Sequence, residues 1–235
     1  MHGVETVSSI FITGGTGYLG RPLIAELLER GYAVHALVRS GSEVKLPSGA
    51  TPLLGDALDA STFVSAIPPA ATVVHLVGTP HPNPAKAAEF TRVDLASIRA
   101  TVDAAQRADV RHIIYVSVAH PAPVMRAYIA ARSEGEALVQ ATGIAATILR
   151  PWYVLGPGHY WPYALVPVYA ILRLLPRTRE TAARLGLVTR RQMVAALVRA
   201  VATPPAAGAR IVEAPEIKSE YGTDDILDEI ARKAQ

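Results

Sequence analysis

The sequence predicts an α/β fold built on a doubly wound parallel sheet. Short runs of β-branched and aromatic residues alternate with longer segments of helical periodicity, and a glycine-rich loop joins the first run to the first helix. Such alternation is typical of a parallel sheet with helices on both faces. Half of the 235 residues are apolar, enough to fill a large core. We expect a single domain over residues 1–235, with a core over about 8–150 and a small C-terminal extension over about 151–235.

The first strand and the first helix flank the glycine-rich loop. Residues 9–13 have strand composition, and apolar residues then recur at helical spacing up to Gly31. The glycines between them fit the spacings Gly14-x-x-Gly17-x-x-Gly20 and Gly15-x-Gly17-x-x-Gly20. Glycines here permit positive φ angles and close approach of a pyrophosphate, and the N–H groups at a helix start attract phosphate. We expect a dinucleotide to contact Gly14, Thr16, Gly17, Tyr18, Leu19 and Gly20.

Five more strands follow, with helices between them. We expect strands over 33–38, 51–54, 72–77, 112–118 and 144–149, and helices over 85–108 and 125–141. In an open parallel sheet, ligands bind at the carboxyl ends of the strands. The expected cofactor site is therefore extended by residues that end or follow strands, namely Asp56, Ala57, Leu76, Val77 and Gly78. Asp56 is expected to face the adenine or to act as a turn residue after Gly55.

The end of the second strand predicts the type of dinucleotide. A carboxylate there would bind the ribose hydroxyls of NAD. The chain instead has Arg39 and Ser40. An arginine favours the 2′-phosphate of NADP through charge-assisted contacts. We expect NADP as the cofactor, with NAD as the alternative.

The composition changes after residue 150 to prolines, glycines and aromatics. We expect this segment to form a wall of a substrate pocket, with Pro151, Tyr153 and Val154 also contacting the cofactor and His159 available to a substrate. Late strands over 186–188 and 209–213 flank a helix over 192–201, and residues 223–225 favour a helix start. The apolar stretch 163–175 is shorter than a membrane-spanning helix needs, so we expect a buried or pocket-lining helix there. We expect residues 161–177 to cover the pocket, with an interfacial membrane helix as the alternative.

Composition argues against several other functions. The chain has no cysteine, and its seven histidines show no metal-ligand spacing, so we expect no metal site. Its basic residues are scattered despite a formal charge of +3, which argues against a nucleic-acid partner. We expect a cytoplasmic protein with a small-molecule substrate and no membrane partner. The sequence leaves the oligomeric state open.

A resemblance to a known family rests on five features. The glycine loop, Gly55-Asp56, Ser117, Tyr128 and Arg150-Pro151 together resemble the short-chain dehydrogenase/reductase superfamily. Within it, the chain is most similar to the atypical NAD(P)H-binding, NmrA-like members. The resemblance covers about residues 8–158 and continues more faintly to Glu213. Its most specific part is the glycine loop, and it implies a Rossmann-type fold.

The resemblance also implies catalytic roles. Tyr128 would act as general acid/base, Ser117 would orient a substrate carbonyl, and Arg132 would replace the lysine with which the family holds the nicotinamide ribose and lowers the tyrosine pKa. Arginine supplies a fixed positive charge but does not easily release a proton. The implied function is an NADP(H)-dependent reductase of a small carbonyl substrate. A non-catalytic redox sensor or scaffold is the alternative, and a sugar-nucleotide epimerase or dehydratase is the third.

Overall fold

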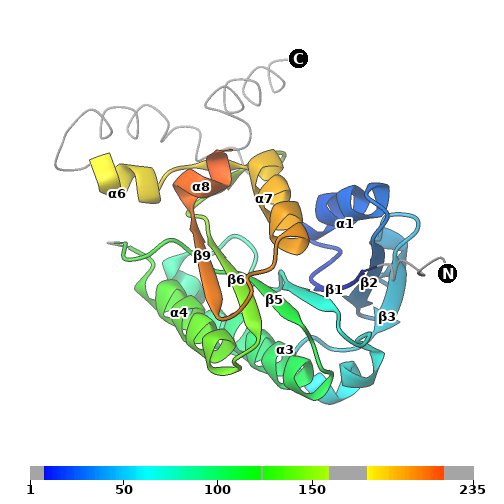
Figure 1. Ribbon diagram of the computed structural model, residues 1–235. Coiled ribbons are helices and arrows are strands. Elements are labelled where there is room, and N and C mark those ends of the chain that lie inside the picture. Colours follow the sequence, from blue (N-terminus) through cyan, green and yellow to red (C-terminus); the bar gives the residue numbers. More distant parts are fainter. Residues whose placement is uncertain (1–7, 123, 159–178, 220–235) are drawn as a thin grey trace.

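The computed structural model describes residues 8–122, 124–158 and 179–219. Figure 1 shows a twisted central sheet with helices on both faces. Seven parallel strands form it in the order β3-β2-β1-β4-β5-β6-β9. The strands are β1 (Ser9–Thr13), β2 (Ala33–Val38), β3 (Thr51–Leu54), β4 (Thr72–His75), β5 (His112–Val116), β6 (Ala145–Arg150) and β9 (Ala209–Glu213). The predicted doubly wound α/β class is confirmed.

The strand order reverses between β1 and β4. From β1 the chain builds outward to β2 and β3, and it then crosses back to place β4 on the other side of β1. Thr13 and His75 are register partners at the carboxyl ends of these two strands. A crevice at such a reversal is where open α/β sheets bind ligands. The topology therefore places the glycine loop, which follows β1, at the expected binding edge.

The helices divide into two layers (Figure 1). One face carries α1 (Gly20–Glu29), α7 (Arg190–Ala202) and α8 (Ala214–Lys218), and the other carries α3 (Ala96–Arg107) and α4 (Arg126–Ala141). The core divides in the same way, with Leu23 and Leu197 in one apolar cluster and Ile98 and Val139 in the other. Both faces of the sheet are thus buried, in agreement with the complete burial of the four residues of β4.

Shorter elements complete the described chain. They are α2 (Ala87–Glu89), α6 (Arg179–Arg184), a π-helical segment (Phe90–Leu95) and four 3₁₀ turns (Glu43–Lys45, Ala60–Thr62, Val64–Ala66 and Pro84–Lys86). The helix expected over 85–108 is therefore four consecutive pieces, of which α3 is the longest. Strands β7 (Val154–Leu155) and β8 (Val188–Thr189) form a separate small sheet.

Several predicted boundaries differ from those observed. The strands expected to end at residues 77 and 118 end at His75 and Val116, because the chain leaves the ladder at the edge where the site lies. The helix expected over 192–201 begins earlier, at Arg190, because Thr189 and Gln192 form a capping box. The late strand expected at 186–188 pairs with β7 and not with the main sheet.

Some expectations fall on residues without a described structure. The helix expected over 163–175, the pocket cover over 161–177, the substrate contact His159 and the helix start at 223–225 lie outside the described residues. Within residues 8–122, 124–158 and 179–219, no helix has the length and apolar character to cross a membrane.

Candidate cofactor and active site

Two glycines of the loop are required by the fold itself. Gly14 has a φ of 77°, and a Cβ atom there would lie 2.8 Å from the carbonyl carbon of Leu76. A Cβ on Gly20 would overlap the carbonyl oxygen of Gly14. Gly17 is different because it is exposed, and an added Cβ would meet only the Gly14 oxygen, at 3.1 Å. Gly14 and Gly20 therefore fix the conformation of the loop, and the backbone at Gly17 stays exposed.

The start of α1 carries no negative charge of its own. Leu19 occupies the N-cap without a side-chain hydrogen bond, and the first turn holds no acidic residue. The first N–H groups of a helix have no intrahelical partner, and the helix dipole makes this end positive. Open backbone at Gly17 next to such an end fits the pyrophosphate of a dinucleotide. The residues present therefore fit an NAD(P) cofactor.

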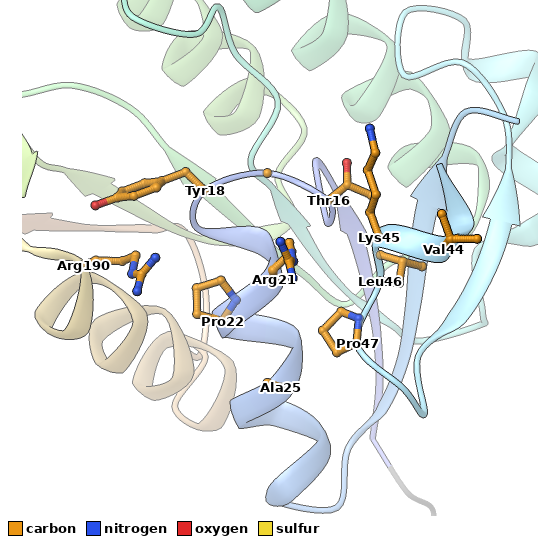
Figure 2. Close-up of a pocket in the computed structure, with 11 residues that line it drawn as sticks. Thr16, Tyr18, Arg21, Pro22, Ala25, Val44, Lys45, Leu46, Pro47 and Arg190 are labelled. Atoms are coloured by element: carbon orange, nitrogen blue, oxygen red, sulfur yellow. The ribbon is translucent and has the colours of Figure 1, made fainter. Parts of the chain in front are cut away.

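A cavity of about 620 Å³ lies beside the loop (Figure 2). It lies between the loop, the first turns of α1, the segment after β2 and the start of α7. In Figure 2, Lys45 and Thr16 extend toward the same edge of the cavity. Within the described part of the chain, the charged side chains that line it are basic: Arg21, Lys45 and Arg190. Sequence reasoning missed these three, although a basic residue shortly after the second strand was an available signal for Lys45.

The predicted adenosine-side residues lie at the ends of β2 and β3. Arg39 and Ser40 directly follow β2 and are exposed. Asp56 is also exposed, and its Oδ1 atom accepts a hydrogen bond from the Leu58 N–H at 3.0 Å. This contact is a turn interaction. Ala57 is half-buried against the core. The adenine-facing role of Asp56 and Ala57 stays a prediction.

Arg132 lies inside the protein, across the carboxyl ends of β4 and β5. Its Nη1 atom donates to the Val116 carbonyl at 2.9 Å, and Nη2 donates to Asp94 Oδ1 at 2.6 Å and to the Val77 carbonyl at 3.5 Å. The residue is 5% exposed. Burial disfavours its charge, but Tyr128, Tyr115 and Asp94 outweigh burial and raise the pKa of Arg132 above its usual value. Arg132 therefore remains a cation with several of its donors already engaged.

Asp94, the partner of Arg132, was missed by sequence reasoning. It lies in the π-helical segment 90–95, a distortion often found at functional sites. Its Oδ2 atom accepts hydrogen bonds from the Thr79 N–H at 3.0 Å and the Thr79 hydroxyl at 2.6 Å. Both carboxylate oxygens are thus satisfied, as a buried charge requires. Its partners lie in distant segments of the chain, so no local pattern in the sequence indicated this role.

Tyr128 and Gly78 surround the Arg132 guanidinium. The guanidinium carbon lies 5.3 Å from the centre of the Tyr128 ring and 5.8 Å from that of Tyr115, within cation–π range. The Tyr128 ring also packs on Phe90, with 5.0 Å between ring centres. Gly78 has no room for a side chain, because a Cβ would collide with Nη2 of Arg132. The structure therefore brings Tyr128 and Arg132 together beside the loop that follows β4.

Ser117 lies next to this group. It directly follows Val116, whose carbonyl Arg132 contacts, and its own N–H donates to the Leu149 carbonyl at 2.8 Å. The side chain is buried, with 3% of the residue exposed, and its hydroxyl has no hydrogen-bond partner within the described part of the chain. A buried hydroxyl without a partner is costly and calls for an explanation such as a ligand.

The segment after β6 contacts the glycine loop. Pro151 is buried, while Tyr153 and Val154 are half-buried. Burial raises the pKa of Tyr153. At Gly156 an added Cβ would collide with the hydroxyl of Tyr18. The predicted wall formed by 151–154 thus continues into direct packing against the loop residue Tyr18.

A buried polar network around His75 lies next to the site. His75 Nδ1 lies 3.0 Å from the Thr13 hydroxyl and 2.9 Å from that of Thr101, and Nε2 lies 3.3 Å from Ser97 Oγ. Burial, with a further contribution from Arg132, lowers the pKa of His75 to about 3. The neutral ring therefore ties the ends of β1 and β4 to α3, the helix that follows Asp94.

Comparison with known proteins identifies the family. The model of the NAD(P)H-binding family matches residues 14–160, more than half of the chain and the part that holds the glycine loop, Ser117, Tyr128 and Arg132. The chain belongs to this NAD(P)H-binding family. The family lies within the atypical and extended short-chain dehydrogenases/reductases, so the predicted superfamily is confirmed. The narrower NmrA-like assignment and the cytoplasmic location stay predictions.

The relatives of this NAD(P)H-binding protein include named reductases. Ceramide reductase of Caulobacter vibrioides is 30% identical over 205 residues, which are 83% of this chain and 61% of that protein. The 4-hydroxy-2-methyl-3-oxo-4-farnesyl-3,4-dihydroquinoline-1-oxide ketoreductase of Stigmatella aurantiaca is 29% identical over 168 residues, covering 62% of this chain and 50% of that protein. The chain thus matches only about half to three-fifths of the length of these relatives.

Solved structures support the fold. WbmH of Bordetella bronchiseptica, determined in complex with NAD⁺, superimposes with a TM-score of 0.66 over 95% of this chain and 81% of that one. The two sequences are 22% identical. A UDP-galactose 4-epimerase superimposes with a TM-score of 0.64 at 20% identity. At these identities the likeness concerns the fold alone.

Proposed function

We propose that the chain is an NADP(H)-dependent reductase that converts a small carbonyl compound to the alcohol. The observation that carries this proposal is the Ser117 hydroxyl, which is buried without a partner next to Arg132 at the carboxyl edge of the sheet. A substrate carbonyl would accept the hydrogen bond that this hydroxyl lacks. The names of two relatives, a ceramide reductase and a ketoreductase, support the same class of reaction.

The proposed roles of the side chains are those that the family resemblance implies. Ser117 orients the carbonyl oxygen, and Tyr128 donates the proton that completes the alcohol. A dinucleotide held by the glycine loop would, when bound, supply hydride to the carbonyl carbon. Arg132 holds the Tyr128 ring through a cation–π contact and joins the segments after β4 and β5 through the Val77 and Val116 carbonyls. The proton lost by Tyr128 returns from water, since Arg132 does not release one.

The basic cavity beside the glycine loop supports a preference for NADP over NAD. Arg39 is exposed directly after β2, and the cavity is lined by Lys45, six positions later in the chain, and by Thr16 of the glycine loop. Among the residues with a described structure, no acidic one lines this cavity. Two cations and a hydroxyl suit a 2′-phosphate, whereas a free ribose diol is best bound by a carboxylate.

A redox sensor that binds the dinucleotide without turnover is the second candidate. It is favoured by the ion pair between Arg132 and Asp94, which offsets the positive charge expected to act on Tyr128. A cation that is balanced by a carboxylate lowers the pKa of a neighbouring tyrosine less than an unbalanced cation does.

One experiment separates the two candidates. Consumption of NADPH is measured with a panel of aldehydes, ketones and quinones for the unmodified protein, Tyr128→Phe, Ser117→Ala and the matched control Tyr32→Phe. We expect at least one carbonyl to be reduced, with turnover lowered about 100-fold or more in Tyr128→Phe and unchanged in Tyr32→Phe. NADPH binding without turnover across the panel would favour the sensor.

A further inference from the structure

Arg190 is distant from the glycine loop in the sequence, but its side chain lies against a residue of that loop. The guanidinium carbon of Arg190 lies 5.3 Å from the centre of the Tyr18 ring, within cation–π range. Arg190 is half-buried, and it lines the cavity of about 620 Å³ together with Gly17 and Tyr18. A residue from the C-terminal part of the chain therefore forms part of the cavity beside the glycine loop (Figure 2).

The backbone of Arg190 is held in place by the elements around it. Arg190 directly follows Thr189, which ends β8 and caps α7. The Thr189 hydroxyl accepts a hydrogen bond from the Gln192 N–H at 3.1 Å, and the Gln192 side chain accepts one from the Thr189 N–H at 2.9 Å. Helix α7 also packs against α1, the helix that follows the glycine loop. A side chain on such a fixed backbone loses less conformational entropy when it binds a ligand.

The Tyr18 side chain is fixed at the same place. A Cβ added at Gly156 would collide with the Tyr18 hydroxyl and would lie 3.2 Å from the Cβ atom of Arg190. Gly156, Tyr18 and Arg190 therefore meet at one point, although they come from the segment after β7, the glycine loop and α7. The Tyr18 ring thus forms a platform for the guanidinium beside the loop.

The two edges of the cavity suit two different groups of one dinucleotide. In Figure 2, Lys45 and Thr16 lie at one edge, and Tyr18 and Arg190 lie at the other. The edge of Lys45 is the expected place of a 2′-phosphate. Tyr18, in contrast, directly follows Gly17, whose exposed backbone fits the pyrophosphate. A guanidinium forms strong, charge-assisted contacts with phosphate oxygens.

We propose that Arg190 binds the pyrophosphate of the dinucleotide while its guanidinium lies on the Tyr18 ring. Arg190 would thereby connect the C-terminal part of the chain to the cofactor. NADP and NAD share the pyrophosphate, so Arg190 contributes to the affinity for both and not to the choice between them. The proposal rests on the placement of the pyrophosphate at the glycine loop. It is independent of the proposed reductase activity, because a protein that binds the dinucleotide without turnover needs the same contact.

Calorimetric titration with NADPH and with NADH tests this proposal. We expect Arg190→Gln to lower the affinity for both dinucleotides by the same factor, about tenfold or more, because one charged phosphate contact is lost. Arg190→Lys should lower both by a smaller factor, since it keeps the charge but not the planar guanidinium. The matched control is Arg191→Gln, which changes the next residue of α7 and should leave both affinities unchanged, because Arg191 is exposed and does not line this cavity.

The salt dependence of binding distinguishes a direct contact from an indirect one. A contact between Arg190 and the pyrophosphate is screened by salt, so the affinity ratio of the unmodified protein to Arg190→Gln should shrink as salt is added. An arginine that only holds the Tyr18 ring would give the same ratio at low and high salt, and that result would overturn the proposal.

Two other results would also overturn it. A loss of affinity confined to NADPH would assign Arg190 to the 2′-phosphate, and unchanged affinity for both dinucleotides would remove Arg190 from the site. If Arg190→Gln lowers the melting temperature of the free protein, Arg190→Lys decides, and its affinities must then fall for both dinucleotides. NADPH binding that depends on Arg190 without reduction of any carbonyl would contradict the reductase proposal and support this one.

Discussion

The Arg132 guanidinium and the Asp94 carboxylate form a buried ion pair, with 2.6 Å between Nη2 and Oδ1. From the family resemblance, we expect Arg132 to replace the lysine of the short-chain dehydrogenase/reductase superfamily. The charge of Arg132 is compensated by Asp94 in the π-helical segment before α3, and its guanidinium also contacts the Val116 carbonyl at the end of β5 and the Val77 carbonyl two residues after β4. The pair therefore joins four segments of the site: α4, the π-helical segment, the loop after β4 and the end of β5.

Removing the acidic partner should strongly destabilise the fold. Asp94→Ala leaves a buried guanidinium without its counter-charge, which costs about 3–5 kcal/mol. Urea unfolding measures this change. The matched control is Glu26→Ala, because Glu26 and Arg30 form an exposed pair worth about 0.5 kcal/mol or less. Equal losses in the two variants would show that Asp94 and Arg132 are not paired in solution.

Stability should fall as the pH is lowered below about 6.5. Burial, aided by nearby arginines, lowers the pKa of His75 to about 3 and that of His112 to about 4. Both titrate near 6.5 in the unfolded chain. Between these values the unfolded state binds more protons, so each histidine lowers stability by up to about 1.4 kcal/mol per pH unit as the pH falls. Above about pH 6.5 both rings are neutral in the folded and the unfolded state, so neither histidine lowers the stability there.

Two variants isolate that histidine contribution. His75→Gln and His112→Gln should each flatten the dependence of the unfolding free energy on pH between about 4 and 6.5. Carboxylates contribute equally in all three proteins, so the difference in slope belongs to the histidine. An unchanged slope in both variants would show that the two rings are not held neutral by burial.

Substitutions at two glycines of the loop should affect cofactor binding and fold stability separately. Gly17→Val should keep the fold and lower NADPH affinity about tenfold or more, because the side chain covers backbone that would face the phosphates. Gly20→Ala should instead lower the melting temperature, because its Cβ overlaps the Gly14 carbonyl. Calorimetric titration and thermal unfolding measure the two effects. Undiminished affinity in Gly17→Val would show that the dinucleotide does not bind this loop.

The choice between the two dinucleotides should depend on basic residues near β2. Arg39→Asp should invert a preference for NADPH over NADH, and Lys45→Gln should reduce that preference about tenfold by removing one phosphate contact. Arg111→Gln, exposed before β5 at the opposite edge of the sheet, is the matched control. Equal affinity of the unmodified protein for NADPH and NADH would contradict the NADP assignment.

The sequence predicts local features of this fold better than contacts between distant segments. The glycine loop and the strand beginnings depend on residues close in the chain, and the last strand, β9, was predicted at its observed bounds over 209–213. The pairing of β8 with β7 depends on residues more than thirty positions apart, and sequence reasoning placed no partner for it. The strand ends at His75 and Val116 were also missed, because apolar residues continue past them into the site.

The candidate site shows the same division. Ser117, Tyr128 and Arg132 could be proposed because a family resemblance gives their order along the chain. Asp94 and Thr79 could not, because their contacts with Arg132 and with each other arise only when the π-helical segment packs against the loop after β4. Lys45 was missed for a similar reason, since only the folded segment after β2 brings it to the cavity of Thr16.

The transfer of a labelled hydrogen tests the central proposal most directly. The protein is incubated with NADPH that carries deuterium at its reactive carbon and with the carbonyl compound that supports turnover best, and the alcohol product is analysed by mass spectrometry. We predict one deuterium at the former carbonyl carbon, and product formation about 100-fold slower or more in Tyr128→Phe with NADPH binding retained. A protein that binds NADPH tightly yet transfers no deuterium to any carbonyl compound would contradict the reductase assignment.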